Sequence, residues 1–298
     1  MELDPHPPAR RPGRRPARRG SHSTLRGSGP ALRGTRPALR GSRPARRPRR
    51  QLFGFVLVLA FLLAAGGAAL WLTLPDVDGL ARANPETTAF IELRRTSAHA
   101  EGRPFHLRWR WRRLDEISPF LRHAVIDSED ARFWEHEGVD WDAVKQAAEK
   151  NWEDRRLGHG ASTITQQVAK NLYLSPSRNP VRKLRELLIA RRLEQSLSKR
   201  RLLEIYLNIA EWGDGVFGAE AAAQRWFSRS AAALSPAQAA RLAVALPGPR
   251  RFSPATRSAA LAHKAARLVR AMREDGLIDG PALDRALVEL AAPRSARR

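Results

Sequence analysis

The 298-residue sequence contains no cysteine. It therefore has no disulfide, no thiolate metal site and no cysteine nucleophile. None of its histidines has the spacing of a zinc metalloprotease, and we expect His136 to be a structural histidine that forms hydrogen bonds. Acidic residues are also few relative to basic ones, 30 against 53, and the resulting net charge of +23 indicates an anionic partner.

The positive charge is concentrated at the N-terminus. Residues 1–50 carry fifteen arginines and only two acids, a net charge of +13. The loose repeat RGSGPAL, RGTRPAL, RGSRPAR places Gly and Pro where a coiled coil needs apolar residues, so we predict a disordered tail. Such a tail either binds nucleic acid or serves as a cytoplasmic topology signal that sits on anionic lipid headgroups. We favour the second function and expect no nucleic-acid partner, because no aromatic or folded reader accompanies the arginines.

Charge is absent altogether from the 23 residues Leu52–Leu74. At a rise of ~1.5 Å per residue, a helix of this length crosses a hydrocarbon layer of ~30 Å. A cleaved signal peptide has a shorter apolar core, of about 7–15 residues, and a shorter leader. Arginines precede the run and aspartates follow it. The positive-inside rule therefore predicts one transmembrane helix at 51–74, with the N-terminus in the cytoplasm and residues 76–298 on the other side.

The remainder divides into a juxtamembrane region at 75–116 and a helical domain at 117–298. In the first, the apolar residues Phe105, Leu107, Trp109 and Trp111 alternate with polar residues, among them two arginines. This alternation predicts either a strand with one buried face or a segment at the membrane interface. From residue 117 onward, helical spacing recurs between Ser, Asp, Pro and Gly boundaries. This pattern predicts one mainly α domain, with no second globular domain after it.

The segment VIDSEDARFWEHEG, Val125–Gly138, contains five carboxylates and two adjacent aromatic residues. By itself it is either a catalytic segment or the charged start of a helix. A second segment, GASTITQQVAKNLYL, has Ser162 or Thr163 as a helix cap and an apolar stripe at i, i+4, i+8. Its polar residues Thr163, Gln167 and Lys170 share one side of that helix. They form either an anion-binding face near a helix N-terminus or a solvated surface.

Two further segments have equally open interpretations. In VRKLRELL, Arg182 and Lys183 precede Glu186 by four and three residues. These residues are either a surface ion pair or a phosphate site beside a carboxylate that could bind a divalent ion. We interpret KRRLLEIYLN mainly as a structural helix with Tyr206 among its packing residues. The sequence SLSK resembles a transpeptidase motif, but no SDN or KTG accompanies it, so we interpret it as a helix junction.

Taken in order, five segments resemble the successive motifs of the peptidoglycan glycosyltransferases, which polymerise lipid II into glycan strands: EDARFWEHEG, GASTITQQVAKNLYL, RKLRE, KRRLLEIYLN and GVFGAEAAAQRWF. The match is dense from 117 to 254, and five motifs in this order are specific. The single anchor and the missing transpeptidase domain make the sequence similar to the monofunctional members. The resemblance implies a lysozyme-like, mainly α-helical fold with a small membrane-apposed lobe.

The resemblance also implies the site. Glu129 matches the general base, and Glu186 matches a second catalytic carboxylate that holds Mg²⁺ or Mn²⁺ or assists proton movement. Six further residues match substrate-binding positions: Asp130, Thr163, Gln167, Lys170, Arg182 and Lys183. The implied reaction inverts the anomeric centre, forms a β-1,4 link and releases undecaprenyl pyrophosphate. A base beside Phe133 and Trp134 is expected to have a raised pKa.

The implied partners are lipid II, the nascent glycan strand, membrane lipids and other cell-wall synthesis proteins. The implied location is the bacterial cytoplasmic membrane, with the catalytic domain on the periplasmic side. Two alternatives remain open. A hydrolytic or lytic enzyme would need no pyrophosphate site, so the cations Lys170, Arg182 and Lys183 argue against it. The other alternative is a non-enzyme, either a membrane-tethered scaffold or a nucleic-acid-binding protein that uses the arginine tail. Deletion of residues 1–48 would distinguish it, because intact polymerisation with loss of polyanion binding would make the tail an accessory.

Overall fold

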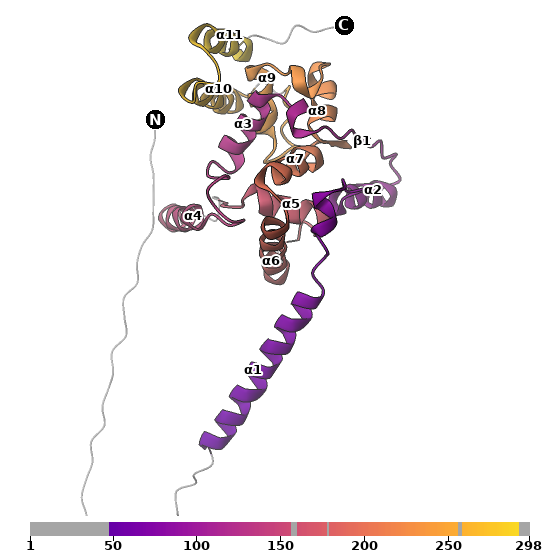
Figure 1. Ribbon diagram of the computed structural model, residues 1–298, viewed down its shortest axis with the longest axis vertical. Helices are drawn as coiled ribbons and strands as arrows, with labels where there is room; N and C mark the ends of the chain where they lie inside the picture. The colour runs from indigo at the N-terminus through magenta and orange to yellow at the C-terminus, as the bar shows by residue number, and fades with distance from the viewer. Residues whose placement is uncertain (1–47, 156–159, 178, 256–257, 292–298) are drawn as a thin grey trace, which may run out of the picture. The chain divides into compact units, whose positions relative to one another are not determined.

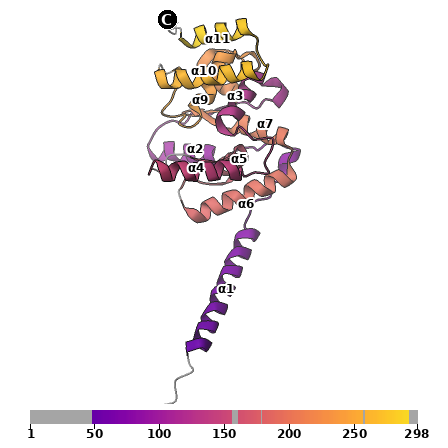
Figure 2. The ribbon, with the colours of Figure 1, turned by 90° about the vertical axis from the view of Figure 1, so that its left-hand side faces the viewer.

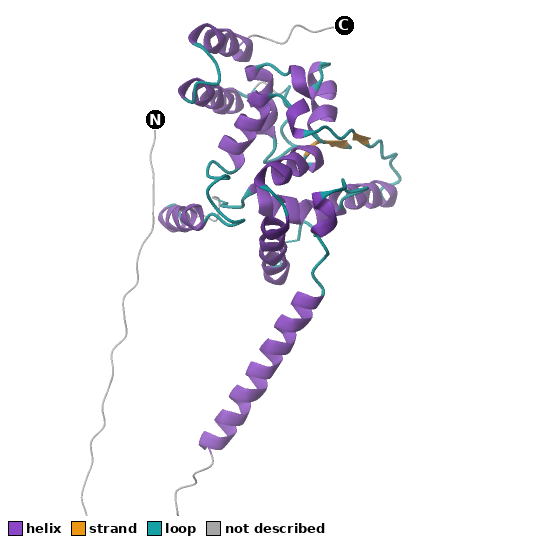
Figure 3. Ribbon diagram, viewed as in Figure 1, coloured by secondary structure: helices purple, strands orange, loops and turns teal. Residues whose placement is uncertain are grey.

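A computed structural model describes residues 48–155, 160–177, 179–255 and 258–291. The prediction of a mainly α protein is confirmed: strands form only a small part of the ribbon (Figure 3). The chain divides into two units, residues 1–57 and 58–298, and helix α1 (Pro48–Leu72) runs across the boundary. Within the described residues, Leu52–Leu72 is the helix long and apolar enough to cross a membrane. It ends two residues before the predicted limit, and the predicted tail lies outside the described residues up to residue 47.

The unit that begins at residue 58 contains the packed helices. Its short 3₁₀ segments are η1 (Asp78–Ala81), η2 (Leu114–Glu116) and η3 (Ala231–Ala233). Its α-helices after α1 are α2 (Ala89–Ala100), α3 (Pro119–Glu129), α4 (Trp141–Glu153), α5 (Ile164–Tyr173), α6 (Pro180–Ser196), α7 (Lys199–Ile209), α8 (Ala219–Phe227), α9 (Pro236–Ala245), α10 (Ala259–Glu274) and α11 (Gly280–Ala291).

Helices α5 and α7 lie at the centre of this unit, with α10 and α11 toward one end and α6 at the other (Figures 1 and 2). The predicted apolar stripe of α5 is buried: Ile164, Val168 and Leu172 all belong to the hydrophobic core. On α7, Tyr206 and its apolar neighbours are buried in the same core, as predicted. Burial of these stripes fixes the rotation of both helices, so their polar residues point in defined directions.

Three short strands form a sheet in the order β1-β3-β2: β1 (Arg108–Trp109), β2 (Glu211–Gly213) and β3 (Val216–Phe217). β1 is parallel to β3, and β2 is antiparallel to it. Gly215 has φ +67, and a Cβ atom there would lie 2.4 Å from the carbonyl oxygen of His106. Because of this close approach, only glycine lets the Arg108 amide donate to the Gly215 carbonyl at 2.7 Å.

The region at 75–116 packs onto the helical domain. Trp109 and Trp111 are half-buried against the core, and the Trp109 indole donates to the carbonyl of Asn208 at 2.7 Å. The Asn208 side chain, fully buried, accepts from the Arg112 amide and donates to the Arg112 carbonyl. These contacts favour the strand interpretation of the Trp–Arg segment over the membrane-interface interpretation. They also show that the packed unit begins before residue 117.

Candidate active site

Glu129 is the last residue of α3, whose inner face is buried in the core. The side-chain amide of Gln167, on α5, donates to its Oε2 atom at 2.8 Å. Its other oxygen, Oε1, is buried and has no hydrogen-bond partner among the described residues. Burial raises the pKa of Glu129; the Gln167 hydrogen bond and the Lys170 charge oppose this rise, and the Asp130 charge adds to it. Such a carboxylate is a suitable proton acceptor near neutral pH.

Gln167 is itself held by a second hydrogen bond. The hydroxyl of Tyr206, on α7, donates to Gln167 Oε1 at 3.2 Å, and burial raises the pKa of Tyr206 well above its ordinary value. Three helices thus contribute to one chain of polar groups that ends at Glu129. Helical spacing predicted only a packing role for Tyr206, because it shows that a residue is buried but not where its hydroxyl points.

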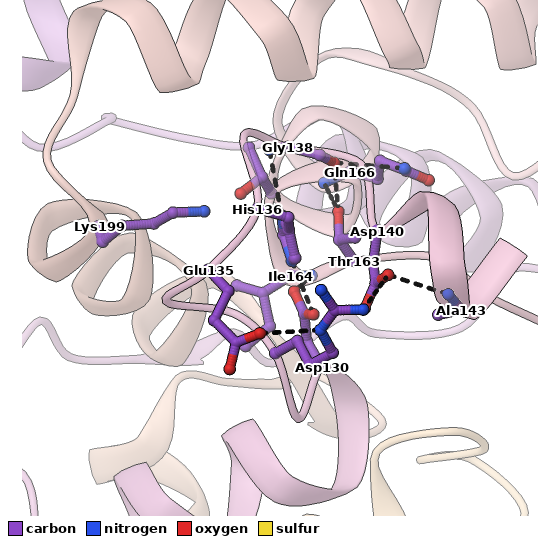
Figure 4. A network of polar contacts seen from close by, with 12 residues as sticks. Asp130, Glu135, His136, Gly138, Asp140, Ala143, Thr163, Ile164, Gln166 and Lys199 are labelled. Atoms are coloured by element: carbon purple, nitrogen blue, oxygen red, sulfur yellow. Dashed lines mark hydrogen bonds and ion pairs between the residues drawn. The ribbon is translucent and has the colours of Figure 1, made fainter.

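Asp130 follows Glu129 directly, but its carboxylate points into the protein (Figure 4). Oδ2 accepts from the amide of Ile164, the first residue of α5, at 2.8 Å, and Oδ1 lies 2.8 Å from His136 Nε2. The Gly138 amide donates to His136 Nδ1, which places the imidazole proton on Nε2, facing Asp130. His136 is therefore the predicted structural histidine. Both oxygens of Asp130 are engaged, so its contacts are those of a positioning residue rather than of a substrate ligand.

Replacing Asp130 with alanine is expected to lower the free energy of unfolding by about 2–3 kcal/mol, because it removes two hydrogen bonds to a buried carboxylate. Urea denaturation of the full chain in detergent would measure this change. Asp127→Ala, at an exposed position in the last turn of α3, is the matched control. Equal stability of the two variants would contradict the positioning role.

Thr163 is confirmed as the cap of α5. Its hydroxyl accepts from the Gln166 amide at 3.2 Å and donates to the Gly138 carbonyl at 2.7 Å. The side chain is 2% exposed. Thr163 therefore joins the start of α5 to the loop after α3, and its contacts do not point it toward a substrate. Its predicted role as a substrate ligand stays a prediction.

The predicted cluster on α6 is formed. Glu186 is buried, and its two oxygens pair separately with Arg182 and Lys183. Lys183 also donates to Gln166 Oε1 at 2.8 Å, which ties α6 to α5. Magnesium and manganese prefer several oxygen ligands, whereas this carboxylate is occupied by two cations, and no group of three acidic or histidine side chains converges within the described ranges. This donor set does not fit a resident divalent ion at Glu186.

Lys170 lies on α5 between the two carboxylates. Burial lowers its pKa, while the charges of Glu186 and Glu129 raise it, and Arg182 and Lys183 lower it further. Its ammonium lies 5.8 Å from the centre of the Phe90 ring. Among the described residues it has no hydrogen bond and no ion pair. A half-buried cation that no described carboxylate contacts directly is a favourable place for an anionic group of a ligand.

Two cavities flank the Glu129–Gln167 hydrogen bond. The smaller, of about 260 Å³, is lined by Glu129 together with Arg132 and Ser162. The larger, of about 650 Å³, contains Gln167 and Lys170. Its other lining residues, which were not predicted to belong to the site, come from α2, α5 and α7, from the start of β2 and from the loop after α9: Phe90, Arg94, Asn171, Tyr206, Ala210, Glu211, Leu246, Pro247, Gly248, Pro249, Arg250, Arg251 and Phe252.

The transglycosylase family model matches residues 99–273 of the chain. A biosynthetic peptidoglycan transglycosylase from Aromatoleum aromaticum is 51% identical over 169 residues, which cover 57% of this chain and 74% of the relative. Its counterpart from Alcanivorax borkumensis is 47% identical over 201 residues, which cover 67% of this chain and 78% of the relative. The predicted resemblance is therefore confirmed. On these matches, with Gln167 and Lys170 close to the half-buried carboxylate of Glu129, the chain belongs to the transglycosylase family.

Proposed function

We propose that this protein is a peptidoglycan glycosyltransferase that polymerises lipid II into β-1,4-linked glycan strands and releases undecaprenyl pyrophosphate. The observation that carries the proposal is the position of Glu129. Glu129 lines a cavity, its oxygen Oε1 has no hydrogen-bond partner among the described residues, and the ammonium of Lys170 lies close enough to oppose the rise in its pKa. A base and a nearby cation are the two groups that this reaction requires. The names of the relatives support peptidoglycan as the substrate.

The smaller cavity suits the acceptor sugar. The 4-hydroxyl oxygen of the acceptor attacks the anomeric carbon of the growing chain, while Glu129 Oε1 takes the hydroxyl proton. The bond between the anomeric carbon and the pyrophosphate oxygen breaks, and its electron pair leaves with the lipid pyrophosphate. A raised pKa favours Glu129 in this role, because a base is most effective when its pKa is near the working pH.

The larger cavity suits the donor. Pyrophosphate is a good leaving group, so its departure requires neutralisation of charge more than a general acid. Lys170, Arg250 and Arg251 line this cavity, and no ion pair joins any of them to an acid in the described part of the chain. Their charges are therefore available for phosphate oxygens. A hydrolytic enzyme would have no use for such a cation set.

The contacts of the other two acids favour an inverting mechanism. A retaining enzyme needs a second carboxylate as nucleophile. Asp130 uses both oxygens to position α5 and His136, and Glu186 pairs with Arg182 and Lys183. Glu129 is then the acid left free to act, and one displacement with one base inverts the centre. Glu186 acts by holding its two cations toward α5.

Helix α1 would hold the enzyme at the membrane that contains its lipid-linked substrate. Its length and apolar composition suit a single span. The arginine-rich tail places the N-terminus in the cytoplasm and the catalytic unit on the periplasmic side of the bacterial inner membrane. On this surface the enzyme and lipid II meet by diffusion in two dimensions.

The test uses the full chain in detergent with fluorescent lipid II and a divalent salt. Polymer on a gel, with β linkages by NMR, is the expected result. Release of soluble cleaved sugars without polymer would indicate a lytic enzyme. No product under varied metal and detergent conditions would overturn the proposal and favour a scaffold.

A further inference from the structure

We propose that Tyr206 is a positioning residue that orients the Gln167 amide and thereby determines which oxygen of Glu129 acts as the base. This inference rests on the proposed function. The geometry is a chain of two hydrogen bonds: the Tyr206 hydroxyl donates to Gln167 Oε1 at 3.2 Å, and Gln167 Nε2 donates to Glu129 Oε2 at 2.8 Å. Glu129 lines the smaller cavity, and Gln167 and Tyr206 line the larger one.

A glutamine amide offers an oxygen acceptor on one side and an NH₂ donor on the other, and rotation by 180° exchanges them. If Gln167 were free to rotate, its oxygen could face the Glu129 carboxylate, which would then lose its donor. The Tyr206 hydroxyl prevents this because its proton requires an acceptor. Tyr206 is 1% exposed, and Gln167 Oε1 is the hydrogen-bond acceptor that the described residues offer its hydroxyl.

The hydroxyl keeps its proton over the whole working range. Burial raises the pKa of Tyr206 well above its ordinary value, and the negative charges of Glu129 and Asp130 raise it further. The Tyr206 hydroxyl therefore remains a hydrogen-bond donor at every working pH, whereas the Glu129 carboxylate at the other end of the chain gains or loses its proton. The charges that face Glu129 are those of Lys170 and Asp130, and neither belongs to this hydrogen-bond chain.

The consequence is a difference between the two oxygens of one carboxylate. Oε2 is held by Gln167, while Oε1 is buried without a partner among the described residues. A proton taken from the acceptor hydroxyl therefore goes to Oε1. Without the Tyr206 hydroxyl, either oxygen could turn toward the acceptor, and the carboxylate would lose the hydrogen bond that holds its pKa down.

Tyr206→Phe tests this inference, because it removes the hydroxyl and keeps the buried ring. We expect kcat to fall about tenfold with KM nearly unchanged. We also expect the acidic limb of the pH–rate profile to move to higher pH, because the base then stays protonated up to a higher pH. Tyr173→Phe is the matched control: it removes the hydroxyl of the other tyrosine in the chain, which donates to the Asp76 carbonyl at 3.5 Å. A fall in kcat without a shift of the acidic limb would overturn the inference.

A second variant guards against a purely structural effect. Gln167→Met should shift the acidic limb in the same direction, and adding Tyr206→Phe to it should cause no further shift. Additive shifts of the acidic limb in the double variant would contradict the proposed chain of hydrogen bonds. Titration of the Glu129 carboxyl by infrared difference spectroscopy against Glu129→Gln needs no substrate. It therefore distinguishes a failure of this inference from a failure of the proposed function. An unchanged Glu129 pKa in Tyr206→Phe would overturn the inference.

Discussion

Replacing Glu129 with glutamine is expected to reduce the rate of lipid II polymerisation about 10³-fold, the upper range for loss of a general base. Glutamine has nearly the same size and can still accept the hydrogen bond from Gln167, so the site keeps its shape. What it loses is the ability to take the proton of the acceptor hydroxyl. The measurement is the initial rate of polymer formation on a gel at saturating substrate.

Glu135→Gln is the control for this variant, because it makes the same change in the same segment at an exposed side chain that pairs with Arg132. Its rate should equal that of the wild type. If Glu129→Gln polymerised normally, the enzyme assignment would stand but the base would be a different residue, and Glu186 would be examined next. If both variants were inactive, the loss would indicate damage to the segment rather than to the base.

The pH dependence of the reaction follows from the same carboxylate. Because burial raises the pKa of Glu129, the rate should fall as the pH decreases through this raised value. Stability should change in the opposite sense. A raised pKa means that the folded chain binds this proton more tightly than the unfolded chain, so ionisation of Glu129 costs stability above that pKa. Glu129→Gln should therefore be at least as stable as the wild type at neutral pH, which thermal unfolding would show.

The second large effect is expected for Lys170→Met, which should lower kcat/KM about 10²–10³-fold, the scale reported for removal of one preorganised charge-stabilising group. Methionine keeps an unbranched chain of similar length but cannot neutralise a departing pyrophosphate. The free energy of unfolding should not fall, because Lys170 has no hydrogen bond or ion pair among the described residues and burial already disfavours its charge. Kinetics and urea denaturation together test both parts.

Lys145→Met, at an exposed position on α4, controls for the loss of a positive charge. Loss of activity at Lys170 with unchanged stability would support the phosphate role. If Lys170→Met instead lost stability and activity in parallel, Lys170 would be a structural cation whose charge interacts with the nearby charges of Glu129 and Glu186.

The helices and their buried faces followed from the sequence because they depend on local periodicity. The stripe of α5 and its Thr163 cap are examples, since burial and capping repeat at fixed spacings. The order of the motifs also predicted that Glu129, Gln167 and Lys170 lie close together, and they do so in the structure. No pattern in the sequence predicted that Arg250 and Arg251, in the loop after α9, line the larger cavity.

The different roles of the two neighbouring acids could not be predicted from local periodicity. Glu129 and Asp130 are adjacent and both acidic, yet Glu129 keeps one oxygen without a hydrogen-bond partner among the described residues, whereas both oxygens of Asp130 are held by Ile164 and His136. The difference arises because the chain leaves the helical conformation at Asp130, which turns its side chain toward α5. Tertiary contacts of this kind have no local signature in the sequence.

The hydrogen bond between Asp130 and the Ile164 amide has a dynamic consequence. It joins the end of α3 to the first turn of α5, so neither end can fray without releasing the other. Glu129 and Gln167 lie within one turn of these two ends. A transient local opening would therefore separate the base from its donor in the same event. The exchange of the Ile164 amide hydrogen with solvent deuterium should then report how often the assembled site comes apart.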